Sequence, residues 1–364
     1  MARSWNMPAA SNLHTHFRHS SDARFKIAVA ECAKLYDFAT AMPNLGKKDL
    51  IRTPEGALAY KAAIEAEGCK HNPRFFVNVP LYLEPDTDPE TVRAGVEKKA
   101  WIAAKLYPKG GTTQSAEGVD FLRLGELYPV FRMMEELGML LLVHAEPTHD
   151  DDEQEIDPWD REREAIDYLE RLIRDFPRLS IVFEHISSEE GAQFVRTYRN
   201  QGAFVGATVA PQYLVWNRGK LLSGGMNPAY YSIPVLKREE DRQALINFIW
   251  HGYGFLGTDS APHTVPNKSK PCGCAGGVFN EPTSLFVYFR IFEEEGRRRA
   301  KDDWFDRFVR FACSAGPRFY GVQAPALPIR SIIEEPWEVP HFYGEGENAI
   351  IPMLAGETIP YRLV

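Results

Sequence analysis

Short apolar runs alternate with longer amphipathic stretches through most of this 364-residue chain. Nearly continuous apolar runs are typical of parallel strands covered on both faces, and amphipathic stretches are typical of the helices that cover them. Strands that alternate with helices indicate βαβ units and a parallel sheet. About eight such units in one chain favour a closed (β/α)8 barrel over an open sheet, since such barrels typically take ~250 residues or more.

The elements can be placed by their residue ranges. Strands are expected at residues 37–42, 75–81, 101–107, 139–144, 179–185, 204–210 and 255–259, with an eighth immediately before His14. Helices are expected at residues 121–137, 160–176, 188–198, 238–250, 282–295 and 302–315. We expect residues 1–322 to form the barrel and residues 323–364, which are rich in Pro, to pack on it as an irregular C-terminal extension.

Composition limits the partners of such a protein. Acidic residues outnumber basic residues by 50 to 42, whereas nucleic-acid binding needs a basic face. No apolar run approaches the ~20 residues of a membrane span, and residues 1–6 carry no apolar signal segment. Five cysteines are sparse and odd in number, which favours a reducing compartment over a disulfide scaffold. We therefore expect a cytoplasmic protein without nucleic-acid or membrane partners.

The first chemical signal is a pair of histidines, His14 and His16, in the segment HTHFR. Residues i and i+2 of an extended segment point to the same side, so the two imidazoles can face one metal ion. A His-x-His pair by itself is weak evidence, because a surface loop can contain two histidines by chance. Its meaning therefore depends on the rest of the chain.

Lys105 lies inside an apolar strand, where a free ammonium group is costly to bury. The side chain could extend to solvent from the strand end, which is the ordinary solution in a barrel. Alternatively, a desolvated neutral amine could have taken up CO₂. The resulting carbamate is an anionic oxygen ligand that can bridge two cations.

Three further polar residues close apolar runs: His144, His185 and Asp259. Each has an ordinary explanation alone, as a core histidine bonded to the backbone or as a carboxylate that caps the next helix. Together with the earlier residues, they follow the first, fourth, fifth, sixth and eighth strands, at the barrel end where active sites form. Imidazoles and carboxylates suit zinc, and two ions sharing a bridging ligand would acidify a bridging water.

The segments that carry these residues resemble the amidohydrolase superfamily and, within it, the class II (bacterial-type) dihydroorotases. They span nearly the whole chain: HTHFR at 14–18, MPNL at 42–45, KLYP at 105–108, LVH at 142–144, FEHI at 183–186, IPVLKR at 233–238, GTDSAPH at 257–263 and CGCAG at 272–276. The resemblance implies a TIM barrel of the amidohydrolase type. We also expect no N-terminal β-sandwich of the kind that many relatives carry, because only a short segment precedes His14.

The resemblance also implies two Zn²⁺ ions per chain. His14, His16 and Asp259 would hold the more buried ion, His144 and His185 would hold the second, and carboxylated Lys105 would bridge them. The residues implied to contact substrate are Arg18, Asn44, Thr112, Thr113, Ile233, His263 and Ala275. Of these, Arg18, Asn44 and His263 would bind a substrate carboxylate, and the two threonines lie in a glycine-containing loop that would close over the site.

The activity implied is that of a zinc-dependent cyclic amide hydrolase, a dihydroorotase that interconverts N-carbamoyl-L-aspartate and L-dihydroorotate in pyrimidine synthesis through a metal-bridging hydroxide. Asp259 would act as base and then as acid. A homodimer is expected, because dimers are common among relatives.

Two alternatives stay open: a hydantoinase-like hydrolase of another cyclic amide or imide, and an inactive structural homologue. Arg18, Asn44 and His263 together favour a carboxylated ring over hydantoin. An inactive homologue would be expected to lose ligands, whereas all six candidates are in place. Three features depart from the family pattern and bear on the substrate: His19, where an acidic residue is usual, Tyr213, where a histidine is frequent, and the loop residues 109–111 (KGG), where relatives carry other small or polar residues.

Overall fold

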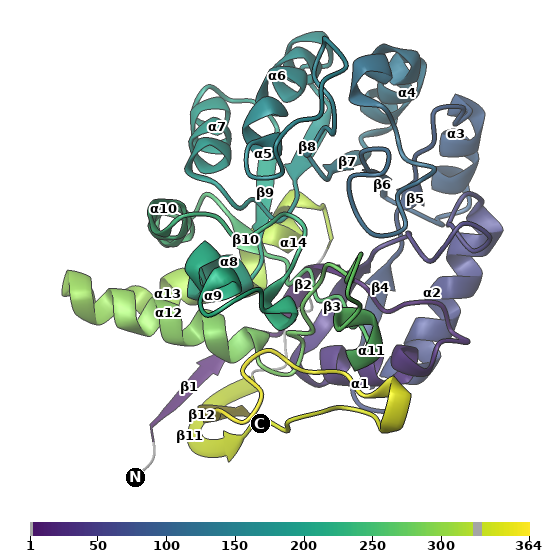
Figure 1. Ribbon diagram of the computed structural model, residues 1–364. Coiled ribbons are helices and arrows are strands. Elements are labelled where there is room, and N and C mark those ends of the chain that lie inside the picture. The colour runs from purple at the N-terminus through teal and green to yellow at the C-terminus, as the bar shows by residue number, and fades with distance from the viewer. Residues whose placement is uncertain (1–2, 323–329) are drawn as a thin grey trace.

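The computed structural model describes residues 3–322 and 330–364, with parallel strands at the centre and helices around them (Figure 1). The central strands are β2 (Ala10–Thr15), β3 (Tyr36–Ala41), β4 (Phe76–Asn78), β5 (Leu81–Tyr82), β6 (Ala103–Leu106), β7 (Leu140–Val143), β8 (Ser180–Phe183), β9 (Val205–Val209) and β10 (Phe255–Leu256). Strands β2, β3 and β4 pair in one sheet, and β5 to β10 pair in chain order in a second. Every neighbouring pair in these two sheets is parallel.

The two sheets together form the expected (β/α)8 barrel. At one edge, the Asp259 amide donates to the His14 carbonyl and the His16 amide donates to the Ser260 carbonyl, each over 2.9 Å. At the other edge, β4 and β5 are two parts of the strand expected at 75–81. Pro80 separates them, because it has no N–H to donate to a neighbouring strand.

The barrel interior explains why polar residues gather at one end. Side chains of a strand point alternately to its two faces. Leu140 and Leu142 belong to the apolar cluster inside the barrel, whereas Leu141 and Val143 belong to the layer beneath the helices. The next inward position after Leu142 is His144. The same face that fills the lower barrel with apolar side chains therefore presents a titratable side chain at its carboxyl end.

The helices pack around the strands, and each of the six expected helical segments has a counterpart, whereas the helices at residues 23–35, 54–68 and 89–97 are additional to those expected. The helical segments are α1 (Ala23–Leu35), α2 (Pro54–Gly68), α3 (Pro89–Glu97), η1 (Phe121–Leu127), α4 (Tyr128–Leu137), α5 (Arg161–Glu164), α6 (Ile166–Asp175), α7 (Glu189–Asn200), α8 (Gln212–Val215), α9 (Arg218–Leu222), η2 (Pro228–Tyr230), α10 (Glu239–Trp250), α11 (Val265–Lys268), α12 (Ser284–Arg299), α13 (Trp304–Val309), η3 (Arg310–Ser314), α14 (Ala315–Phe319) and η4 (Gly346–Asn348). The helix expected at 121–137 is divided, because Pro129 lies in the first turn of α4, where its missing N–H leaves no bond unmade.

The C-terminal segment differs from the expectation of irregular structure. Strands β11 (Arg330–Glu338) and β12 (Thr358–Leu363) form an antiparallel sheet with the N-terminal strand β1 (Ser4–Met7), in the order β1-β11-β12. Two prolines within these strands, Pro336 and Pro360, occupy places that a β-sheet tolerates. Pro336 lies at a register shift between Glu334 and Trp337, and Pro360 lies in an edge strand. Residues 323–329 of the expected extension lie outside the described residues.

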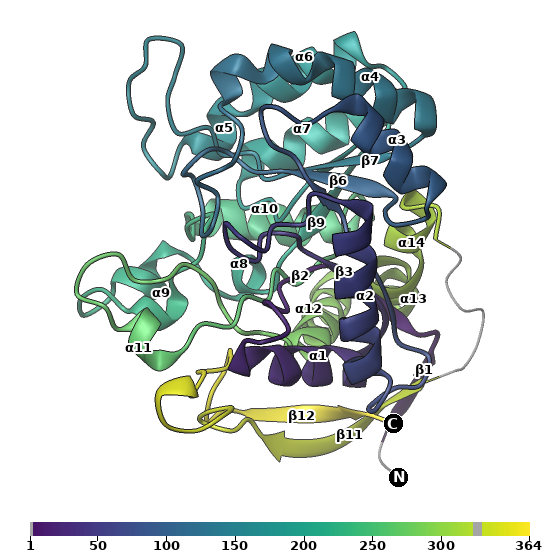
Figure 2. The same cartoon turned by 90° about the vertical axis from the view of Figure 1, so that its right-hand side faces the viewer.

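The small sheet lies along one side of the barrel, next to α1 and beside both chain ends (Figure 2). Arg330 at the start of β11 donates from Nη1 to the carbonyl of Lys34 in α1 over 2.7 Å. The sheet thus covers a flank of the barrel and leaves the carboxyl ends of the strands free for the site. Within the described residues, no helix combines the length and apolarity that a membrane crossing requires.

Candidate active site

Six candidate ligands lie at the carboxyl end of the barrel strands. His14 is in β2, and His16 directly follows it. Lys105 is in β6, and His144 directly follows β7. His185 and Asp259 follow β8 and β10 by two and three residues. Parallel strands bring their carboxyl ends to one rim, so residues far apart in the chain meet there.

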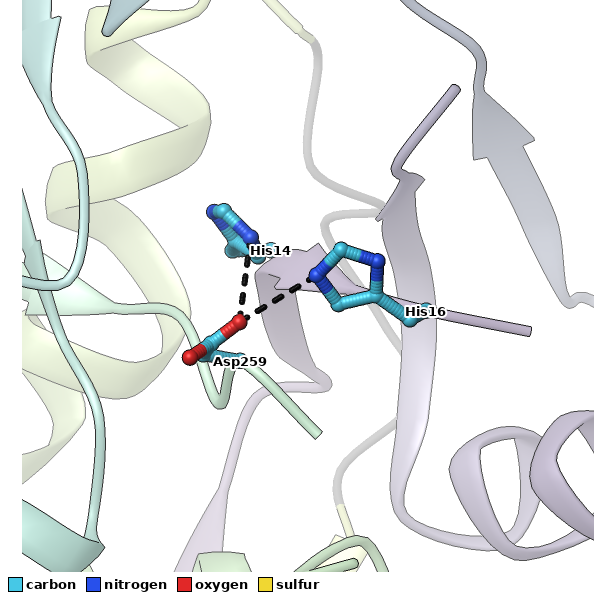
Figure 3. A group of neighbouring side chains, drawn as sticks. All are labelled: His14, His16 and Asp259. Atoms are coloured by element: carbon cyan, nitrogen blue, oxygen red, sulfur yellow. Dashed lines mark ion pairs between the residues drawn. The ribbon is translucent and has the colours of Figure 1, made fainter. Parts of the chain in front are cut away.

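His14, His16 and Asp259 form a compact group that could hold a metal ion. The Oδ1 atom of Asp259 lies 3.3 Å from Nε2 of His14 and 3.2 Å from Nε2 of His16. Figure 3 shows both imidazoles turned toward this carboxylate. Asp259 has a φ of 48°, a left-handed conformation that is unfavourable for a non-glycine residue and that occurs often at functional sites.

The charges of this group suit a cation. Burial alone would raise the pKa of Asp259, but hydrogen bonds from His14 and His16 hold it well below its ordinary value. Burial lowers the pKa of His16 to about 4, so its imidazole is neutral near pH 7 and offers a lone pair. For His14, the nearby carboxylates of Glu184 and Asp259 outweigh burial and raise the pKa. Glu184 and Asp259 therefore place two ionised carboxylates beside His14, where they would favour a bound cation.

The other three candidate ligands lie beside this group. The His185 ring centroid is 5.0 Å from that of His14 and 4.6 Å from that of His144. Burial lowers the pKa of His185 well below its ordinary value, and His144 lowers it further. Among the described residues, neither Nδ1 of His185 nor Nζ of Lys105 has a hydrogen-bond partner. Buried polar atoms rarely lack a hydrogen-bond partner unless a ligand or an ion binds to them.

Lys105 is fully buried, with its Nζ atom 5.0 Å from the centroid of the Tyr107 ring. Burial lowers the pKa of its amine to about 8, against the opposing charges of Glu184 and Asp259. A lysine in this position is not free to reach solvent, which removes the ordinary explanation of an extended side chain. Its neutral fraction is the form that reacts with CO₂.

Two buried glutamates that the sequence analysis did not single out orient the histidines. Glu184 Oε2 lies 2.7 Å from His14 Nδ1 and also accepts from the Thr208 hydroxyl over 2.5 Å. Glu146 Oε2 lies 2.7 Å from His144 Nε2. Metal-binding histidines typically bond through their second nitrogen to a carboxylate, which fixes the ring. The signal for Glu184 is its place between Phe183 and His185, since a carboxylate within an apolar run needs a partner.

Arg18 and His263 meet at the same rim. Arg18 Nη2 lies 3.0 Å from His263 Nε2, and its Nε donates to the Pro262 carbonyl over 3.1 Å. The Arg18 backbone has a φ of 69°, and the Tyr60 hydroxyl donates to its carbonyl over 2.8 Å. Burial lowers the pKa of Arg18 to about 10, which leaves it charged near pH 7. A buried cation held in this way can bind an anionic group with little competition from water.

The loop with the two threonines reaches Asn44. Asn44 donates from Nδ2 to the carbonyl of Thr113 over 3.2 Å, and the Thr113 hydroxyl lies 3.5 Å from the Gly276 carbonyl. The Thr112 amide donates to Ser115 Oγ over 3.0 Å within the loop. The loop thus lies across the site, between Asn44 and the segment that contains Ala275.

Ile233 and Ala275 lie in neighbouring segments. The peptide bond between Ile233 and Pro234 is cis. A Cβ on Gly276 would lie 2.7 Å from Cγ1 of Ile233, so the two segments approach too closely for a side chain there. The Tyr213 hydroxyl donates to the Pro234 carbonyl over 2.7 Å. Tyr213, one of the departures from the family pattern, therefore uses its hydroxyl group to support this segment.

His19, another departure from the family pattern, contacts Ser21 and Asp49. Its side chain is exposed, and Nδ1 lies 2.8 Å from the Ser21 hydroxyl. We therefore assign His19 no part in the site.

Known proteins resemble this chain over most of its length. A family model described as amidohydrolase matches residues 13–199. A dihydroorotase of Novosphingobium aromaticivorans is 40% identical over 96% of this chain and 95% of its own length. The chain belongs to the dihydroorotase family of amidohydrolases. Another family member, a dihydroorotase of Escherichia fergusonii, is 38% identical over 96% of this chain and 95% of its own.

Solved structures of the family have the same fold. Dihydroorotase of Saccharomyces cerevisiae in complex with 5-fluoroorotic acid superposes with a TM-score of 0.89 at 26% identity, covering 100% of this chain and 98% of that one. Dihydroorotase of Campylobacter jejuni superposes with a TM-score of 0.85 at 27% identity, and the match again covers 100% of this chain and 98% of that one. An L-hydantoinase of Arthrobacter aurescens, at 17% identity, covers 98% of this chain and 82% of that one with a TM-score of 0.76. Its likeness concerns the fold alone.

Proposed function

We propose that this protein is a metal-dependent dihydroorotase that interconverts L-dihydroorotate and N-carbamoyl-L-aspartate in pyrimidine synthesis. The observation that best supports this substrate is the pairing of Arg18 with His263 at the rim where the candidate ligands lie. A buried guanidinium at this place matches the carboxylate that dihydroorotate bears on its ring and that hydantoin lacks. The dihydroorotase relatives at 38–40% identity support the same substrate.

The metal centre in this proposal contains two zinc ions. His14, His16 and Asp259 would hold one, His144 and His185 would hold the other, and a carbamate on Lys105 would bridge them. Support comes from the unpartnered Nζ of Lys105 and Nδ1 of His185, and from the donor set, which suits zinc. When bound, such ions lower the pKa of a shared water enough for it to attack near neutral pH.

The side chains of this chain would perform the remaining steps. Asp259, ionised at neutral pH because of its low pKa, would accept the proton of the attacking water and deliver it to the leaving ring nitrogen. Arg18, Asn44 and His263 would fix the substrate carboxylate and thereby the ring. The main chain at Ile233 and Ala275 would contact the ring amides. Thr112 and Thr113 would exclude water and stabilise the developing oxyanion.

Steady-state hydrolysis by the zinc-loaded protein tests this proposal. Dihydroorotate is compared with hydantoin and dihydrouracil, two cyclic substrates without a carboxylate. A strong preference for dihydroorotate is the expected result. Turnover of hydantoin alone would replace the proposed substrate with that of a hydantoinase, and inactivity on all three rings with metal bound would overturn the assignment to this reaction.

We also propose that the protein acts as a cytoplasmic homodimer. The five cysteines are free in the structure, as a reducing compartment favours. Light scattering coupled to size exclusion tests the dimer, for which a mass twice the 41.3 kDa of one chain is expected. A monomeric mass at micromolar concentration would contradict it.

A further inference from the structure

Lys268, the last residue of α11, is buried, with 7% of its surface exposed. Its ammonium group donates to three main-chain carbonyls: those of Tyr231 at 2.9 Å, Ala275 at 3.0 Å and Gly277 at 2.8 Å. An ammonium group has three donors and no acceptor, so every donor has a partner. A surface lysine rarely has all three donors bonded to protein acceptors, because water competes for them.

The three carbonyls belong to two segments that the proposed function uses. Tyr231 lies two residues before Ile233, and Ala275 is itself a proposed contact to the substrate. The segments are also bonded to each other and to α11: the Gly277 amide donates to the Tyr231 carbonyl over 3.0 Å, and the Ala275 amide donates to the Asn267 carbonyl over 3.1 Å. Lys268 thus lies where the two segments meet.

Successive carbonyls at residues 275–277 have different partners. Those of Ala275 and Gly277 accept from Lys268, whereas that of Gly276, between them, lies 3.5 Å from the Thr113 hydroxyl of the loop over the site. By fixing the two outer carbonyls, the ammonium group fixes the peptide between them. The orientation of the main chain toward the loop therefore depends on a side chain that lies outside the group of candidate ligands.

We infer that Lys268 is a positioning residue for substrate recognition, which holds the main chain near Ile233 and Ala275 in the geometry that binds the ring amides. The inference rests on the proposed function for its substrate, but its structural part does not. Hydrogen bonds from a charged donor are stronger than neutral ones, and three of them on one atom restrain two segments at once. Burial lowers the pKa of Lys268 to about 8, which leaves the ammonium mostly charged near neutral pH.

A first experiment tests the positioning without any substrate. Hydrogen exchange of the metal-loaded protein is measured for the wild type, Lys268→Met and a control, Lys270→Met, whose lysine is exposed two residues further along the chain. We expect the amides of Ala275 and Gly277 to exchange about tenfold faster or more in Lys268→Met alone, because the carbonyls lose a bond of about 1.5–3 kcal/mol. The amides of His16 and Asp259, at the metal group, should keep their protection. Unchanged exchange at Ala275 and Gly277 would overturn the inference.

A second experiment tests the consequence for recognition. Lys268→Met should raise KM for dihydroorotate and Kd for 5-fluoroorotate by about tenfold or more, with kcat within about threefold and metal content equal to that of the wild type. Lys268→Gln, which keeps a neutral donor, should give a smaller rise, and it replaces the Met variant if that one does not fold. A fall in kcat together with metal loss would show a general structural role and reject the inference.

The two experiments separate the possible failures. Faster exchange at Ala275 and Gly277 with unchanged KM and Kd would overturn the role in recognition. Faster exchange in a protein whose wild type neither hydrolyses dihydroorotate nor binds 5-fluoroorotate would overturn the proposed substrate and support the positioning role of Lys268.

Discussion

The Nδ1 atom of His14 lies 2.7 Å from Oε2 of Glu184, and both side chains are almost completely buried. The carboxylate fixes the imidazole ring so that its other nitrogen, Nε2, faces Asp259. The Thr208 hydroxyl holds the same carboxylate oxygen from the neighbouring strand. The geometry of the proposed metal ligands therefore depends on a residue that is not itself a ligand in the proposal.

Replacing Glu184 tests this dependence. Glu184→Gln should lower zinc affinity by about 10- to 100-fold, since the loss of a carboxylate behind a metal-binding histidine typically has that effect. Competition with a chromogenic chelator measures the affinity. Glu190→Gln, on an exposed position of α7, is the matched control and should bind zinc like the wild type. Equal affinities for all three proteins would contradict a role for Glu184 in orienting His14.

Asp259 carries the proposed proton transfer. Asp259→Asn should reduce kcat for dihydroorotate by about 10²- to 10⁴-fold, the usual contribution of a general acid–base group, while at least one zinc stays bound. Initial-rate assays measure kcat, and metal analysis measures the bound zinc. Asp302→Asn, an exposed aspartate of the chain, serves as control. A variant of Asp259 with a near-normal rate would remove this residue from proton transfer.

Arg18 is expected to recognise the substrate carboxylate. Arg18→Lys keeps the charge but loses the planar fork, so it should lower kcat/KM for dihydroorotate by about 10- to 100-fold, corresponding to about 1.5–3 kcal/mol. Any residual turnover of dihydrouracil, which has no carboxylate, should change little. Parallel kinetics on the two rings provide the measurement. Equal losses on both would indicate that Arg18 supports the fold of the site and not the carboxylate.

The proposed carbamate on Lys105 makes metal loading depend on CO₂. The protein stripped of metal should be inactive, and zinc added in buffer free of CO₂ should restore activity slowly and incompletely. Zinc with bicarbonate should restore it fully, and native mass spectrometry should then detect the mass of one added CO₂. Full and equal recovery in both buffers, or a bare ammonium next to bound metal in a crystal structure, would reject the carbamate.

The contribution of Glu281 to the stability of the fold should fall with rising pH. This buried carboxyl accepts from the Thr15 hydroxyl and from Asn12 Nδ2, and burial raises its pKa from 4.5 to about 8. The folded protein therefore holds a proton that the unfolded chain has released between these two values. Its contribution to stability is complete below the unfolded pKa and is lost as pH rises toward about 8, by up to ~1.4 kcal/mol per pH unit.

Glu281→Gln, a neutral mimic of the protonated acid, should remove this slope. Urea unfolding of the metal-loaded proteins at about pH 6.5 and about pH 8 measures the difference. The stability of the variant relative to the wild type should increase between the two values, whereas Glu190→Gln should follow the wild type. Parallel slopes for Glu281→Gln and wild type would show that Glu281 is ionised in the folded protein.

Much of the fold is predictable from the sequence, because apolar runs mark the segments that become buried. The strand around Leu140 and Leu142 is visible as an apolar run, and His144 stands out at its end. The fold and the family follow from such runs and from the motifs that close them, and both are confirmed. The roles of the individual site residues stay predictions, although the structure places the six candidate ligands at one rim.

Other features of the structure have no local signal in the sequence. Glu146 and Lys268 resemble ordinary polar residues, since their neighbours in the sequence do not indicate which atoms they contact. Lys268 donates hydrogen bonds to the carbonyls of Tyr231 and Gly277, which belong to other segments. The small sheet of β1, β11 and β12 was missed for the same reason, because strand pairing between the two ends of the chain leaves no local periodicity.

The sequence by itself determined the alternation of strands and helices and the residue types at the strand ends, because the period of apolar side chains depends only on nearby residues. The tertiary structure decided which polar atoms meet. His14 and Glu184 are 170 residues apart, and they face each other because barrel strands bring their carboxyl ends together in one rim. Packing sets such pairings, and the packing depends on the whole chain.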